Sequence, residues 1–171
     1  MATDRVTTYG VLGTTLRVLG AASLLSVGAI HLQQYDKLYS DVPTIGTLFV
    51  LSFVGATLTA IALLMPLEHL LGRLGFGRLG ELAVVVLALL GIGQAAMQFV
   101  FLAISEQRPL FGFQEPGYDP TAILAARAAE IATVVFLCAF LIIVWVRRSR
   151  RVSEGRSVQS RPARHANLGG A

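Results

Sequence analysis

The sequence contains little of what most enzymes use for chemistry. Its one cysteine, Cys138, excludes an internal disulfide and any Cys-x-x-Cys redox pair. Charged residues make up only 14% of the chain, well below the quarter that is typical of a soluble domain. The motifs of serine hydrolases, phosphotransferases and intramembrane proteases are absent. We therefore predict no catalytic residue, cofactor or bound metal, which indicates a non-enzymatic protein.

Four long apolar segments occupy most of the sequence. They cover residues 11–33, 43–65, 82–104 and 121–146. Each has about the 20 residues that a helix needs to cross a hydrocarbon layer of ~30 Å. They lack the alternation of polar and apolar residues that marks strands. The sequence therefore predicts an all-α, polytopic membrane protein, in which residues 1–146 form an antiparallel bundle of four transmembrane helices.

Basic residues are distributed unequally between the two sides that four crossings create. One side holds Lys37 and Arg108, whereas the other holds eleven arginines. Cytoplasmic loops carry the excess of Lys and Arg, so both termini are expected in the cytoplasm and the protein in the plasma (inner) membrane. The eleven are Arg5, Arg17, Arg73, Arg78, Arg147, Arg148, Arg150, Arg151, Arg156, Arg161 and Arg164.

The two ends of the chain allow further expectations. Residues 147–171 are basic and contain almost nothing apolar to bury, which predicts a disordered cytoplasmic tail. Its first arginines directly follow the last span, where they favour contact with the lipid bilayer and not with nucleic acid. An alternative for the first span is a cleaved signal peptide that ends at the small residues Val27, Gly28 and Ala29.

The connections between the spans carry weaker signals. Asp41 lies two residues before Pro43, and Asp119 directly precedes Pro120. Both aspartates are predicted to cap the helices that follow. The segment from Pro66 to Gly80 contains four glycines, and its part from Leu71 to Leu79 is too rich in glycine to predict a stable helix. The loop at residues 105–118 is rich in aromatic residues and is predicted to fold back over the helix ends. Its candidate partner-contact residues are Phe111, Phe113 and Tyr118.

Polar residues within the spans gather in the half that is predicted to face outward. Because polar groups are costly in lipid, each requires a partner or a function. Spacings of three or four residues place several of them on shared helix faces, and faces that turn inward would form one pocket open to the outside. The candidates are His31, Gln34, Tyr35, Gln94, Gln98, Arg127 and Glu130.

Three of these candidates have alternative interpretations. Arg127 and Glu130 lie three residues apart and can instead form a self-contained ion pair. His31 can be a hydrogen-bonded helix end, or can ligate a metal together with Glu130, Asp41 or Asp119, although no cluster of His and Cys at ligand spacing supports a metal site.

A resemblance to known proteins covers about the first two spans. The stretch from Gly28 to Leu32 with Tyr35, followed by Val42 to Phe49, is similar to that of uncharacterised small four-helix membrane proteins of actinobacteria. The general plan of the chain also resembles the DoxX-like group. This resemblance implies that His31, Tyr35 and residues 43–49 belong to a shared outer structure, and it implies no particular activity.

Three functional hypotheses follow from the sequence. The first is an accessory or interaction subunit whose outward-facing polar pocket and aromatic loop contact a small ligand, a membrane protein partner or further copies of this chain. The second is a small homo-oligomeric transporter that uses Glu130 as its coupling carboxylate, because a bundle this small has little room for a pathway of its own. The third is a membrane redox enzyme that uses His31.

Overall fold

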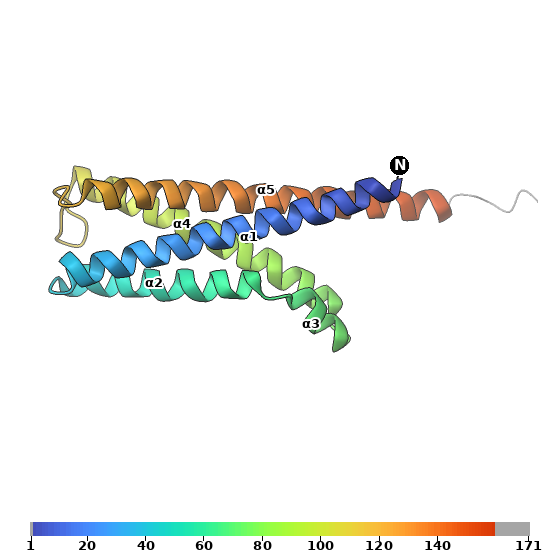
Figure 1. Cartoon of the computed structure of the whole chain (residues 1–171), viewed down its shortest axis with the longest axis horizontal. Coiled ribbons are helices and arrows are strands. Elements are labelled where there is room, and N and C mark those ends of the chain that lie inside the picture. Colours follow the sequence, from blue (N-terminus) through green and yellow to red (C-terminus); the bar gives the residue numbers. More distant parts are fainter. Residues whose placement is uncertain (1, 160–171) are drawn as a thin grey trace, which may run out of the picture.

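A computed structural model of the chain describes residues 2–159, and these residues form an all-α structure (Figure 1). Four of the described helices contain segments long and apolar enough to cross a membrane, so the predicted polytopic all-α fold is confirmed. The elements are, in chain order, α1 (Ala2–Gln34), the π-helix η1 (Tyr35–Tyr39), α2 (Pro43–Leu64), α3 (Leu67–Arg73), α4 (Gly77–Gln107) and α5 (Pro120–Gln159).

The four long helices form a ring in which consecutive helices run in opposite directions. α1 packs against α2 and α5, and α4 closes the ring by packing against the same two helices. The first residues of α1 and the last turns of α5 lie at one end, which we call the terminal end (Figure 1). η1 and residues 108–119, which connect α4 to α5, lie at the opposite end, which we call the loop end. The first residues of α1 and the last turns of α5 therefore lie on the same side of the bundle.

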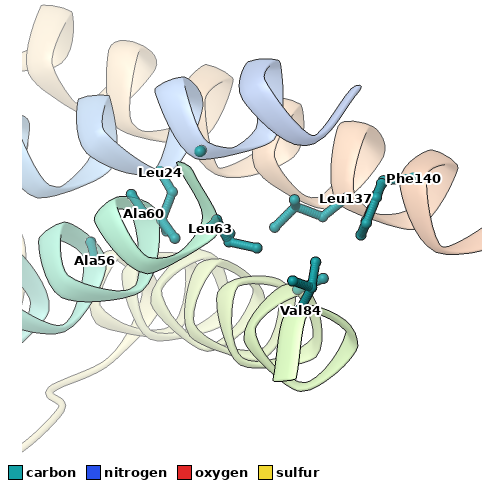
Figure 2. Close-up of a cluster of buried hydrophobic side chains, with 9 residues drawn as sticks. Leu24, Ala56, Ala60, Leu63, Val84, Leu137 and Phe140 are labelled. Atoms are coloured by element: carbon teal, nitrogen blue, oxygen red, sulfur yellow. The ribbon is translucent and has the colours of Figure 1, made fainter. Parts of the chain in front are cut away.

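Apolar side chains face both outward and inward, as lipid on one side and packing on the other require. Leu51, Leu58 and Leu124 are among the large apolar side chains exposed on the outer surface, where acyl chains can cover them. The interior is an apolar cluster to which α1, α2, α4 and α5 all contribute side chains (Figure 2). Its members are Ala21, Leu24, Ala56, Ala60, Leu63, Val84, Ala88, Leu137 and Phe140.

Small residues let the helices approach closely around Leu137. A Cβ atom placed on Gly20 would lie 2.4 Å from Cδ2 of Leu137, and one placed on Gly91 would lie 2.9 Å from its Cδ1. The leucine side chain therefore fills the space that these two glycines leave on α1 and α4. Helices in lipid have no hydrophobic force between them, so close contacts of this kind supply much of their association energy.

The connection between α2 and α4 is more ordered than its glycine content predicts. The expectation of no stable helix from Leu71 to Leu79 is wrong at both ends of that stretch, because α3 continues through Arg73 and α4 begins at Gly77. Gly80 is buried in the contact between these helices, where an added Cβ would lie 2.8 Å from Cα of Glu68. Gly75 supplies the turn between them with φ +84°. Two of the glycines thus serve a tight turn and a close contact instead of a flexible loop.

The last helix is longer than predicted. We placed the start of the disordered tail at Arg147, but α5 continues through Gln159. Residues 147–159 contain no proline, and extending an existing helix avoids the cost of forming a new nucleus. The expectation of disorder is therefore wrong for residues 147–159, and residues 160–171 lie outside the described part of the chain.

Candidate functional site

A cavity of about 130 Å³ lies at the loop end of the bundle. All four long helices and residues 108–119, which we call the capping loop, contribute to its wall. Much of the lining is apolar and comes from Ile45, Leu48, Phe49, Phe101, Leu102 and Ile123. Apolar cavities of about 150 Å³ in proteins hold a molecule the size of benzene, so this space suits a ligand of a few heavy atoms.

Four of the seven polar residues selected from the sequence line this cavity. His31 and Gln34 come from α1, Gln98 comes from α4, and Glu130 comes from α5. In each pair predicted from helical spacing, only one member lines the cavity, namely His31, Gln98 or Glu130. Whether these residues meet depends on how three helices are rotated about their axes. The structure turns the relevant faces of α1, α4 and α5 toward the same space.

Gln94 and Tyr35 are not part of the lining but brace its wall. Gln94 Nε2 donates a hydrogen bond to the backbone oxygen of Ser52 at 3.0 Å, which joins α4 to α2 beside the cavity. Tyr35, the first residue of η1, lies against α2, since a Cβ on Gly46 would be 3.2 Å from its Cε2 atom.

Arg127 does not line the cavity either, and the interpretation of a self-contained Arg127–Glu130 ion pair is wrong. The guanidinium Nη2 donates to the carboxylate of Glu106 on α4, and both side chains are about one-third exposed. The arginine side chain is long enough to reach the neighbouring helix at the partly exposed rim, where its charge is less costly. Glu130 consequently faces the cavity without an ion-pair contact to this guanidinium.

Glu130 and Gln98 are two deeply buried polar groups of the site. Glu130 is 1% exposed and Gln98 is 7% exposed. Among the described residues, no group hydrogen-bonds to Oε2 of Glu130 or to either amide atom of Gln98. Buried polar groups nearly always have hydrogen-bond partners, and leaving one unsatisfied costs about 1–3 kcal/mol. Because both side chains border the cavity, a polar occupant there can supply the contacts that they lack.

His31 presents one ring nitrogen to a defined partner. Its Nδ1 lies 2.8 Å from the backbone oxygen of Val27, and a carbonyl oxygen can only accept, so Nδ1 carries the proton. The ring packs against Phe49 with a centroid distance of 5.1 Å. His31 is thus a hydrogen-bonded residue of the helix end. In the part of the chain that the structure describes, no group of three or more His, Cys, Asp or Glu side chains is placed to hold a metal ion.

Glu115 and Tyr39 complete the site, and sequence analysis did not select either of them. The Tyr39 hydroxyl donates to the carboxylate of Glu115, whose Oε1 accepts the backbone N–H groups of Gly117 at 2.9 Å and Tyr118 at 3.3 Å. The backbone N–H of Glu115 also donates to the oxygen of Ser105 on α4 at 2.9 Å. These contacts anchor the capping loop over the cavity.

The three aromatic residues predicted to contact a partner are divided between two environments. Phe113 lines the cavity and stands edge-on to Tyr39, with ring centroids 5.5 Å apart and an interplanar angle of 87°. Phe111 is 57% exposed and Tyr118 is 69% exposed. Phe113 therefore belongs to the cavity wall, while the other two remain on the surface.

Asp119 connects the start of α5 to the end of α1. Its Oδ1 accepts the backbone N–H of Ala122 at 3.0 Å, which confirms its predicted capping role, and its Oδ2 accepts Nε2 of Gln34 at 3.1 Å. These two hydrogen bonds, the backbone one first, hold the pKa of Asp119 below its ordinary value. The matching prediction for Asp41 is wrong, because Val42 occupies the N-cap of α2 and no side chain caps that helix.

Comparisons with protein-family models, curated proteins and solved structures found no significant match to this chain. What the protein does must therefore be inferred from the cavity and the bundle themselves.

Proposed function

We propose that this chain is a plasma-membrane protein that binds a small polar molecule in a pocket facing the outside of the cell, and that it acts as an accessory or interaction subunit without catalysis. The observation that carries the proposal is the pair of buried polar side chains, Glu130 and Gln98, that border the cavity with unsatisfied atoms. A bundle that served packing alone would gain stability from apolar residues at both positions.

The interior of the bundle favours a pocket that opens at one end. Between the cavity and the terminal end lies the apolar cluster of Leu24, Leu63, Leu137 and Phe140 (Figure 2). A polar ligand that passed through this cluster would lose its hydrogen bonds, at a cost of several kcal/mol. Binding and release on the same side of the membrane therefore fit the structure better than passage through the bundle.

A small homo-oligomeric transporter remains the alternative function. The deep burial of the Glu130 carboxylate favours it, because ionisable residues inside membranes often serve as coupling sites. Flux in proteoliposomes separates the two functions. We expect no flux of the bound ligand by the wild-type protein, whereas flux that Glu130→Gln abolishes would support the transporter.

The orientation can be tested with introduced cysteines. Phe111 in the capping loop and Leu74 in the turn after α3 are 57% and 69% exposed and lie in connections on opposite sides of the membrane. In a Cys138→Ser background, a membrane-impermeant maleimide applied to intact cells should label Phe111→Cys and leave Leu74→Cys unlabelled until the cells are opened. The reverse pattern would overturn the proposed orientation.

Ligand and partner binding can be tested by purification from native membranes in mild detergent. We expect the wild-type protein to retain a small molecule that denaturation releases, and Gln98→Leu to lose it. Gln107→Leu, a matched change at an exposed position on the same helix, should retain it. Wild-type protein that carries neither a small molecule nor a protein partner would contradict the proposed function.

A further inference from the structure

The groups of the cavity wall that can carry a full charge are mainly carboxyl groups. Glu130 and Glu115 contribute two carboxyl groups, and among the described residues no lysine or arginine lines the cavity. The nearest arginine along α5, Arg127, directs its guanidinium to Glu106. His31 uses Nδ1 to contact a backbone oxygen, so this nitrogen is not available to a ligand. An ionised carboxylate in this wall repels an anionic ligand and attracts a cationic one.

Aromatic rings form a continuous part of the same wall. Tyr39 stacks on Phe49 with centroids 4.8 Å apart and an interplanar angle of 26°, and Phe113 meets Tyr39 edge-on at 5.5 Å. The faces of aromatic rings attract organic cations, and such rings are the common recognition element for alkylated ammonium groups. The remaining wall is aliphatic, which suits the alkyl part of such an ion.

The two carboxyl groups differ in how far their hydrogen bonding is satisfied. Glu115 accepts hydrogen bonds from Tyr39 and from two backbone N–H groups of the capping loop. Glu130 retains one carboxylate oxygen without a hydrogen-bond partner among the described residues, and Gln98 retains both its amide oxygen and its amide nitrogen. Two acceptors that border one space call for a ligand with N–H or O–H donors, and Glu130 is the group best placed to balance a positive charge.

We propose that the cavity binds a small alkylammonium ion, with Glu130 as its counter-ion, Gln98 as a second hydrogen-bond acceptor and the Phe49–Tyr39–Phe113 rings against its alkyl group. This inference rests on the proposed function and names the ligand class of the same site. A bare metal ion fits less well, because most of the wall is aliphatic or aromatic and offers few oxygen ligands.

The test compares three compounds of similar shape and different charge. tert-Butylammonium, tert-butanol and pivalate are titrated into the full-length protein in detergent at neutral pH, and binding is followed by calorimetry and by the shift in Tm. We expect the wild-type protein to bind tert-butylammonium at least about tenfold more tightly than tert-butanol, and not to bind pivalate. This comparison needs no variant and so does not depend on how a substitution folds.

Variants then locate the counter-ion. Glu130→Gln keeps the shape of the side chain and removes its charge, and we expect it to weaken tert-butylammonium binding at least about tenfold. Glu81→Gln makes the same change at an exposed position on α4 near the terminal end and should leave binding unchanged. Circular dichroism and size-exclusion chromatography check that both variants keep the wild-type helix content and size.

The outcomes separate the two proposals. Equal binding of tert-butanol and tert-butylammonium, or unchanged ammonium binding by a folded Glu130→Gln variant, would overturn the ammonium site. Failure of the wild-type protein to bind any of the three compounds would also overturn it. None of these outcomes decides the proposed function, which is tested separately by whether a small molecule or a partner is recovered from native membranes.

Discussion

Gly46, near the start of α2, is the position where the smallest change should disturb the site most. An added Cβ would lie 2.6 Å from the backbone oxygen of Tyr39. That oxygen also accepts a hydrogen bond from Val42 N–H at 3.1 Å, which closes the turn between η1 and α2. Gly46→Ala therefore pushes on the residue whose hydroxyl anchors the capping loop.

The size of the effect follows from the contact distance. An ordinary contact to a Cβ atom is 3.4 Å or more, so the alanine methyl group is about 0.8 Å too close (3.4 − 2.6 Å) to a backbone atom that no side-chain rotation can move. Overpacking of this kind typically costs about 1–3 kcal/mol. We expect Gly46→Ala to lower the free energy of unfolding by this amount and to loosen the capping loop.

Gly93→Ala is the matched control. It makes the same change within α4, and its Cβ would meet nothing within 4 Å. Alanine is the better helix former, so this variant should be as stable as the wild type or more stable by up to about 1 kcal/mol. Unfolding in mixed micelles of increasing SDS content, followed by circular dichroism, measures both. A Gly46→Ala variant as stable as Gly93→Ala would refute the reasoning.

Three further predictions concern single polar contacts. Tyr39→Phe removes a hydrogen bond to the Glu115 carboxylate, worth about 1.5–3 kcal/mol, and should speed hydrogen exchange in the capping loop. Tyr118→Phe changes an exposed side chain and should leave the exchange rate unchanged. Equal exchange rates in the two variants would contradict this prediction. Glu68→Ala removes the carboxylate whose Oε1 lies 2.7 Å from Arg17 Nη1. This variant should be less stable in SDS titrations than the double variant that also carries Arg17→Met, because only the single variant leaves a partly buried charge unpaired. The pKa of Asp119 lies below its ordinary 3.8 in the folded protein, so this carboxylate stabilises the fold above about pH 4 and the stabilisation is lost as the pH falls through the folded pKa. The stability difference between the wild type and Asp119→Asn should therefore shrink below about pH 4 in acid titrations, and a constant difference would argue against the contact.

Hydrophobic length and helical spacing were sufficient to predict the bundle. Apolar runs of about 20 residues without strand alternation specify helices in lipid, because a helix satisfies all backbone hydrogen bonds within the segment itself. Their polarity within apolar spans selected His31, Gln34, Gln98 and Glu130, which the structure brings to one cavity. Which of the polar faces would meet was not encoded in spacing, since helix rotation depends on the packing of small residues such as Gly20.

The parts that sequence reasoning missed depend on irregular backbone. Tyr39 reaches the cavity because α1 ends in a π-helix, which shifts the side-chain positions of its last turn away from ordinary helical spacing. Glu115 reaches it because the capping loop folds back over the helix ends. Arg127 was matched to Glu130 because local pairs are visible in a sequence, whereas its partner, Glu106, is brought near only by the packing of α4 against α5.

Glu115 gives the pocket and its cover a common anchor. The same carboxylate forms part of the wall and holds the capping loop through Tyr39 and the backbone of residues 117 and 118. Any ligand that hydrogen-bonds to the oxygen atoms of Glu115 competes with those contacts. Occupancy of the cavity and order of the capping loop are therefore thermodynamically linked. A change in the order of the capping loop then reports, at the surface of the bundle, that the interior site has been filled.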